Sequence, residues 1–235
     1  TAVLAASVLA FFTLYYKTNI ILGGIAINSL ASGGTIFFLY LAAHDKGTSV
    51  SLDSKVLPNI NIPFIEDIPV LGPAVSGHNI LTYLSILAVV FTFYLLKRTA
   101  LGYHIRAVGE KKEAADSVGI SVARTQAIAL IISGVMSGLG GAFMSMGYVS
   151  WFSRDMTAGR GFTAVAAQYL GRANAGGTLM ASLVFGTADA LANVLQSLRV
   201  PAEFVQMIPY AATLLGLVFY SVNAKRIRRL KKLAK

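Results

Sequence analysis

The sequence predicts an all-α fold, a polytopic bundle of transmembrane helices in which some helices are short or broken. Hydrophobic residues make up 55% of the 235 residues and charged residues 13%, against roughly 25% charged in an ordinary soluble domain. The apolar residues fall in runs close to the roughly 20 residues that a helix needs to cross a bilayer. The net charge of +10 comes from Lys and Arg between these runs, not from a basic folded face, so we expect no nucleic-acid partner.

The first two apolar runs cover residues 1–16 and 20–41. Residues 1–16 end at Tyr15, Tyr16 and Lys17, an aromatic and basic edge typical of a membrane interface. We interpret them as the tail of a span, and residues 20–41 as a full span. The chain begins inside an apolar stretch with no basic segment or cleavage site ahead of it. We therefore expect it to be incomplete at its N-terminus.

Residues 44–78 are predicted to form a long extracytoplasmic loop. They contain Pro58, Pro63, Pro69 and Pro73, which exclude a continuous helix. Apolar side chains such as those of Ile60 and Phe64 make the segment too hydrophobic for a free linker. We expect it to lie over the outer ends of the helices.

Two further spans are predicted over residues 80–96 and 123–146. The second contains two pairs of small residues four apart, Gly134 with Gly138 and Ser137 with Gly141. This spacing lets transmembrane backbones pack closely. We interpret it as helix packing rather than gating.

The pattern becomes irregular after residue 146. Residues 147–161 are a predicted loop, residues 162–170 an apolar run too short to span, and residues 171–177 another break. Residues 178–195 and 204–222 are predicted spans, followed by a basic tail over 223–235. The whole chain, 1–235, is interpreted as a single transmembrane domain.

The Lys and Arg residues are polarised between the two sides of this arrangement. Lys17, the six basic residues between 97 and 124, Arg172 and the seven after residue 224 fall on one side. The positive-inside rule makes that side cytoplasmic. The sequence therefore predicts a multi-pass plasma-membrane protein with a cytoplasmic C-terminus, whose basic tail is attracted to the anionic bilayer surface.

The cytoplasmic loop over residues 97–124 holds a short motif. Residues 110–118 predict a helix with acidic residues near its start and Gly119 placed to close it in the left-handed conformation. We expect Ala114, Ala115 and Val118 to share one face and Glu113 to be available to a basic residue of a partner. A solvated connecting loop is the alternative.

Several segments resemble the permease subunits of ABC importers. Glu113, Ala114, Ala115 and Gly119 match their EAA-xxx-G coupling motif, and residues 99–109 are similar to the branch that serves branched-chain amino acids, ribose-like sugars and nucleosides. Residues 27–29, 68–72 and 161–166 are similar to the nucleoside-type permeases. The resemblance covers about residues 18–222 and implies a type II-like importer permease, although family members carry more helices upstream.

The resemblance also implies partners. These are a cytoplasmic ABC ATPase, a second permease subunit that is identical or different, and an extracytoplasmic substrate-binding lipoprotein. The chain has no G-x-x-x-x-G-K-[ST] phosphate loop, so ATP hydrolysis is expected on a separate chain. The resemblance favours nucleosides as substrate, with ribose-like sugars or branched-chain amino acids as alternatives. A more distant alternative for the whole protein is an ion-coupled secondary transporter.

The candidate substrate pathway combines the irregular segment with polar residues in the spans. Gln168 lies in the short apolar run, while Asp189, Asn193 and Gln196 fall on one helical face at i, i+4 and i+7. A carboxylate inside a span is a functional-site hypothesis by default, although Asp189 could instead bond a neighbouring helix. Asn28, in the first full span, is the fourth candidate of the pathway beside Gln168, Asp189 and Asn193.

Enzyme chemistry is not expected. The chain has no Cys and three isolated His residues, so the sequence predicts no metal site. No paired carboxylates or Ser/His/Asp arrangement lies on the spans, and we predict neither catalytic residues nor a cofactor.

Overall fold

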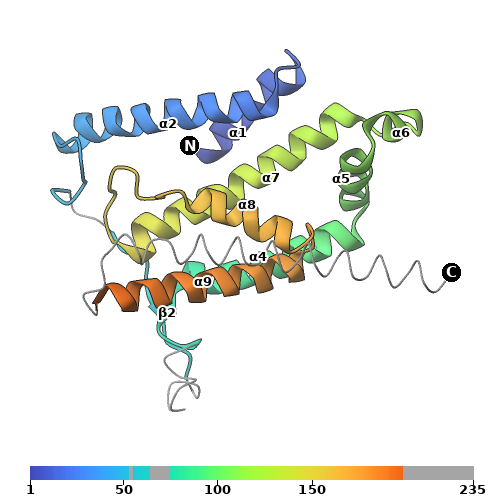
Figure 1. Ribbon diagram of the computed structural model, residues 1–235. Helices are drawn as coiled ribbons and strands as arrows, with labels where there is room; N and C mark the ends of the chain where they lie inside the picture. The colour runs from blue at the N-terminus through green and yellow to red at the C-terminus, as the bar shows by residue number, and fades with distance from the viewer. Residues whose placement is uncertain (53–54, 64–74, 198–235) are drawn as a thin grey trace. The chain divides into compact units, whose positions relative to one another are not determined.

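The computed structural model describes residues 1–52, 55–63 and 75–197 (Figure 1). Within these residues, four helices are long and apolar enough to cross a membrane: Ile20–Ala43, Ile80–Arg98, Val122–Tyr148 and Ala175–Leu195. They confirm the predicted spans over residues 20–41, 80–96, 123–146 and 178–195. The predicted span over 204–222 and the basic tail lie outside the described residues. The chain divides into two compact units, Thr1–Ala158 and Gly159–Lys235.

The first unit is built from helices, with a long connection between α2 and α4 and shorter ones elsewhere. Helices α1 (Ala2–Leu14), α2 (Ile20–Ala43), α4 (Ile80–Arg98) and α7 (Val122–Phe143) are its long elements, and α7 continues into the π-helix η1 (Met144–Tyr148). Asparagine side chains cap two of them: Asn19 accepts a hydrogen bond from the N–H of Ile21 (2.8 Å) and Asn79 one from that of Leu81 (3.0 Å). These caps satisfy backbone donors that a helix start leaves unpaired, so α2 and α4 begin where they do.

Helices α1 and α7 pack through small residues. A Cβ added to Gly134 would lie 2.5 Å from the Cβ of Ala6, and one added to Gly138 would lie 2.9 Å from the Cβ of Ala2. The predicted packing role of this pair is confirmed. At Gly141, which belongs to the other predicted pair, a Cβ would meet nothing within 4 Å among the described residues. Since Ala2 faces Gly138 and Ala6 faces Gly134, α1 runs antiparallel to α7.

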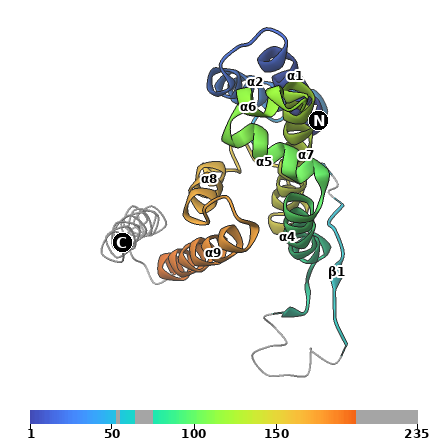
Figure 2. The same cartoon turned by 90° about the vertical axis from the view of Figure 1, so that its right-hand side faces the viewer.

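The loop after α2 is joined to the loop after α7. The N–H of Ser49 donates to the carbonyl of Phe152 (2.9 Å), and the N–H of Arg154 donates to the carbonyl of Gly47 (2.8 Å). Further along, strand β1 (Asn59–Ile60) pairs antiparallel with β2 (His78–Asn79), which leads directly into α4 (Figure 2). The C-terminal ends of α2 and α7 and the N-terminal end of α4 therefore lie on one side of the first unit.

The opposite end of the first unit carries Lys17 and the segment that joins α4 to α7. Because α1 is antiparallel to α7, Lys17 lies at the same end of the unit as the segment that joins α4 to α7. In the last turns of α4, next to that segment, the Lys97 ammonium lies 4.7 Å from the centre of the Phe93 ring. At the end of α1, Phe11 and Tyr15 stack with their ring centres 5.5 Å apart. Aromatic side chains thus accompany Lys17 and Lys97 at this end of the unit.

The second unit contains a helical hairpin. Helix α8 (Arg160–Leu170) turns over residues 171–174 into α9 (Ala175–Ser197), and the two pack side by side (Figure 1). The buried side chains between them are those of Ala167, Ala181 and Phe185. Eleven residues of α8 are only about 16 Å long at 1.5 Å per residue, so α8 is too short to cross a bilayer, as predicted.

Candidate functional site

The connection between α4 and α7 is a pair of short helices, α5 (Ala100–Glu110) and α6 (Lys112–Ser117). Thr99 forms the corner: its Oγ1 donates to the carbonyl of Leu95 (2.6 Å) and accepts from the N–H of Gly102 (3.1 Å). A Cβ at Gly102 would lie 2.6 Å from the Cα of Leu96, so the backbone of α5 is in direct contact with the last turn of α4. This contact fixes the direction in which α5 leaves the membrane span.

Helix α6 ends at the glycine of the motif. Gly119 has a φ of 83°, which confirms the predicted left-handed residue. Its N–H donates to the carbonyl of Asp116 (2.9 Å), and the N–H of Ile120 donates to that of Ala115 (3.1 Å). Together these bonds form a Schellman motif, which satisfies carbonyls that the end of a helix leaves unpaired.

The predicted start of the motif helix, at Glu110, is wrong. Glu110 is the last residue of α5, and Lys111 is extended, with a φ of −154° and a ψ of 108°, so the helix over residues 110–118 is divided in two. The cap of α6 at Lys111 includes no side-chain hydrogen bond. The break places α6 as a separate helix of six residues (Figure 2).

The two alanines of the motif face opposite environments. Ala115 is buried, as is Val108 of α5, whereas Ala114 and Glu113 are exposed and Val118 is 74% exposed. The expectation that Ala114, Ala115 and Val118 share one face is therefore wrong, because Ala115 anchors α6 against the protein. What α6 presents outward is a carboxylate beside two apolar side chains, Ala114 and Val118.

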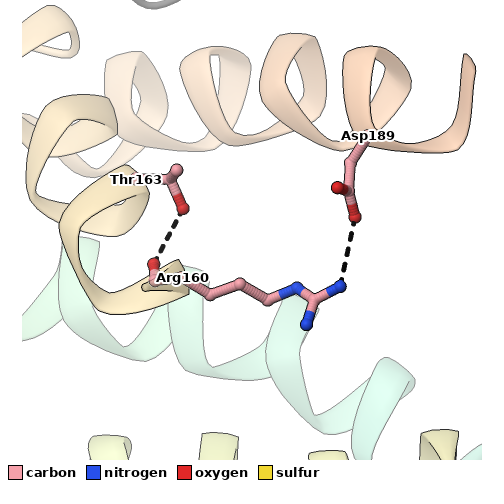
Figure 3. A network of polar contacts seen from close by, with 3 residues as sticks. All are labelled: Arg160, Thr163 and Asp189. Atoms are coloured by element: carbon pink, nitrogen blue, oxygen red, sulfur yellow. Dashed lines mark hydrogen bonds and ion pairs between the residues drawn. The ribbon is translucent and has the colours of Figure 1, made fainter. Parts of the chain in front are cut away.

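An ion pair lies across the hairpin of the second unit. The guanidinium Nη2 of Arg160, the first residue of α8, lies 3.6 Å from Oδ2 of Asp189 in α9 (Figure 3). In the same turn of α8, Thr163 Oγ1 donates to the carbonyl of Arg160 (2.8 Å). The side chains of Arg160 and Asp189 are 44% and 46% exposed within the chain. The pair therefore joins the two helices and can be reached from outside the hairpin.

Sequence reasoning assigned Arg160 to an outer loop and missed it as the partner of Asp189. The two glycines that flank Arg160 favour a loop, yet α8 begins at Arg160, two residues earlier than predicted. The one available signal was chemical: a carboxylate inside a span needs a partner, and Arg160 is the nearest basic residue before it other than Arg172.

None of the other predicted pathway residues is buried in the described part of the chain. Gln168 in α8 and Asn193 in α9 are exposed. Asn28 is exposed on α2, in the first unit. The side chain of Gln196 lies outside the described residues. No group of three or more His, Asp or Glu that could hold a metal ion occurs in the described part of the chain.

A separate cavity of about 370 Å³ lies between α4 and α7. Its lining is mostly apolar and includes Leu81, Leu84, Leu139 and Phe143. Of its two hydroxyls, Ser85 Oγ donates to the carbonyl of Thr82. A ligand rich in hydroxyl groups would find few partners there, so this cavity is a poor candidate for a polar substrate.

Comparison with known proteins gives consistent matches. A family model described as "Branched-chain amino acid transport system / permease component" matches residues 1–221. The nucleoside ABC transporter permease protein NupC of Lactococcus lactis is 30% identical over 222 residues, which are 92% of this chain and 69% of the relative. The guanosine ABC transporter permease protein NupQ of Bacillus subtilis is 35% identical over 214 residues, 86% of this chain and 64% of the relative.

A putative glucose ABC transporter permease of Haloferax volcanii is also similar, with 32% identity over 203 residues, 84% of this chain and 59% of the relative. The chain thus spans between 59% and 69% of the length of these three relatives. No solved structure matches it.

Proposed function

Because this chain belongs to the family of branched-chain amino acid transport system permease components, we propose that it is a permease subunit of an ATP-driven ABC importer of nucleosides. Its spans are those of a multi-pass membrane protein, and its relatives are transport subunits rather than enzymes. The two units form parts of one transmembrane permease domain. ATP hydrolysis takes place on a separate chain.

Nucleosides are the preferred substrate because two relatives that this chain matches over 92% and 86% of its length are a nucleoside and a guanosine permease. The similarity to a putative glucose permease keeps sugars as the second candidate. Nucleosides and glucose are both neutral molecules that carry hydroxyl groups. A path for either must offer polar contacts inside the membrane without a net charge.

Coupling to the ATPase is assigned to α6. The observation that carries this proposal is that α6 is anchored by buried Ala115 and closed at Gly119, while Glu113, Ala114 and Val118 face outward. An exposed apolar side chain such as Val118 favours burial against a partner, and Glu113 offers a charge to a basic residue beside the partner's groove. The partners are a cytoplasmic ABC ATPase, a second permease subunit and a substrate-binding lipoprotein.

The substrate pathway is assigned to the side of the α8–α9 hairpin that carries Asp189, with Gln168 and Asn193 as further polar candidates on the same two helices. Asn28, on α2 of the first unit, is a separate candidate for the pathway. The segment of residues 97–124 is cytoplasmic, as the positive-inside rule requires, and so is the C-terminal tail. The loops of residues 44–78 and 149–158 are extracytoplasmic, where the lipoprotein delivers the substrate.

The test is uptake by the complete transporter, reconstituted in liposomes with its ATPase, second permease and lipoprotein. Labelled uridine, ribose, glucose and leucine are compared, with ATP present or absent on the ATPase side. We expect ATP-dependent uptake of uridine above that of the other three. Preferred uptake of a sugar or of leucine would show that nucleosides are not the substrate. Uptake that survives without ATP but collapses with an ionophore would show that the importer is ion-coupled rather than ATP-driven.

A further inference from the structure

Asp189 lies six residues inside the span Ala175–Leu195 that the length and hydropathy of α9 indicate, so the Arg160–Asp189 pair is not at the end of that span. Helix α9 crosses the bilayer and continues eight residues beyond Asp189 to Ser197, which is roughly 12 Å at 1.5 Å per residue. Arg160 contacts Asp189, so the start of α8 lies at the same depth. Gly159, the last residue of the irregular segment before α8, has a φ of 77° and is carried to this depth with it.

Charged groups and irregular backbone are tolerated at such depth only inside protein or beside a water-filled cavity. Both side chains of the pair are nearly half exposed within the chain. Their separation of 3.6 Å is longer than the roughly 2.7–2.9 Å of a tight charge-assisted hydrogen bond. A ligand that approaches the exposed side of the pair can therefore reach both groups.

The hydrogen-bonding groups and the net charge of the pair indicate which kind of ligand it can bind. A carboxylate accepts hydrogen bonds and a guanidinium donates them, whereas a hydroxyl group does both. Because the pair as a whole has no net charge, it gives no advantage to an anion such as a phosphate or to a cation. It suits a neutral molecule with adjacent hydroxyl groups.

We propose that Arg160 and Asp189 form a transient binding site for the two adjacent hydroxyls of the ribose ring. This inference rests on the proposed nucleoside import and assigns recognition in the membrane to the sugar rather than the base. Thr163 is a positioning residue for the site, because its bond to the carbonyl of Arg160 holds the first turn of α8.

The experiment measures binding to the purified complex of permease and ATPase, without the lipoprotein, so that only the membrane site is probed. Uridine and 2′,3′-dideoxyuridine, which lacks both hydroxyls, are titrated up to millimolar concentration. The variants are Asp189→Asn and, in case that protein does not fold, Arg160→Lys, which keeps the charge but not the planar fork. Thr187→Val, which changes an exposed residue of the same helix, is the matched control.

Wild type and Thr187→Val should bind uridine on the order of tenfold better than the dideoxy analogue, and each site variant should lose most of this preference, as expected for hydrogen bonds to charged groups. Equal affinities for the two ligands in wild type, no uridine binding at all, or a preference unchanged in the variants would overturn the site. Uridine uptake by the reconstituted transporter is measured in parallel: its absence overturns the proposed function, whereas normal uptake without a hydroxyl preference overturns only the site.

Discussion

Gly171 and Gly177 lie backbone to backbone where α8 turns into α9. A Cβ on Gly177 would lie 2.5 Å from the carbonyl oxygen of Gly171, and a Cβ on Gly171 would lie 2.5 Å from the carbonyl carbon of Gly177. The residues that separate the two helices become larger with distance from the turn. Next to these glycines come Ala167 and Ala181, and further along lies the long side chain of Arg160. The turn is thus the closest approach of the two helices.

Replacing Gly171 with alanine should destabilise the hairpin. Its φ of −75° is accessible to alanine, so the cost comes from the overlap alone, which is typically about 1–3 kcal/mol for an overpacked site. Thermal unfolding of the purified permease in detergent should show the loss.

The control for this variant is Gly176→Ala, one residue before Gly177. A Cβ there meets no atom of the described residues within 4 Å, and alanine is the better helix former by roughly 1 kcal/mol. The melting temperature of Gly176→Ala should therefore be equal to or above that of wild type. Equal melting temperatures for both variants would show that the turn is looser than described.

Asn79 joins the outer loop to the start of α4. Its Oδ1 accepts from the N–H of Leu81 (3.0 Å), its Nδ2 donates to the carbonyl of Leu57 (3.2 Å), and the residue is buried. Asn79→Ala should cost about 1–2 kcal/mol for the cap, and it also removes the contact with the loop. Limited proteolysis within residues 44–58 should become faster.

Asn19→Ala is a matched control, because Asn19 caps α2 in the same way, by accepting from the N–H of Ile21, but is exposed rather than buried. This variant should lose some stability without exposing the outer loop to protease. Faster cleavage of the loop in both variants would assign the effect to general destabilisation.

The membrane spans could be predicted because hydropathy and helix length are local properties of the sequence. The four-residue spacing of Gly134 and Gly138 also predicted close packing. It could not identify the partner helix, because Ala2 and Ala6 lie more than a hundred residues away in the sequence. Ser137 and Gly141 have the same spacing, yet no described atom lies within 4 Å of a Cβ placed at Gly141. The spacing permits close packing and does not choose the face.

The candidate site was predicted less completely, for the same reason. Gly119 could be assigned because a left-handed helix end favours glycine, which is a local requirement. The extended residue Lys111, which separates α5 from α6, carries no glycine or proline signal of its own. The partner of Asp189 depends on the hairpin turn, which brings together residues 29 positions apart, and the burial of Ala115 rather than Ala114 depends on where α5 packs.

Replacing Gly119 with alanine should weaken the end of α6. A residue with a side chain pays roughly 1–2 kcal/mol in the left-handed conformation, and no atom lies close enough to add a steric cost. The Schellman bonds of Gly119 and Ile120 should open more often, so amide hydrogen exchange at these two residues should accelerate. The proposed coupling predicts a parallel fall in ATP-driven uptake.

Gly109→Ala serves as the control in this segment. Gly109 is an exposed residue of α5, and a Cβ there meets nothing within 4 Å. Alanine should leave exchange in α6 and uptake as they are. Normal uptake in a Gly119→Ala protein whose α6 exchanges rapidly would count against a coupling role for α6.

Reversing the charge of Glu113 tests the proposed contact with the ATPase directly. The side chain is exposed on α6, so Glu113→Arg should leave the stability of the permease within about 0.5 kcal/mol of wild type. If Glu113 meets a basic residue of the ATPase, the new arginine creates a repulsion and leaves a charge unpaired at the interface. Truncating or reversing one partner of such a pair costs roughly 2–5 kcal/mol, so uptake and co-purification of the ATPase should both be lost.

The matched variant is Glu110→Arg, which makes the same charge change at an exposed residue three positions earlier, at the end of α5. It alters the net charge of the loop equally but lies outside α6. ATPase binding should be retained in Glu110→Arg and lost in Glu113→Arg. If both variants lose the ATPase, the contact depends on the overall charge of residues 97–124, and if neither does, Glu113 is not at the interface.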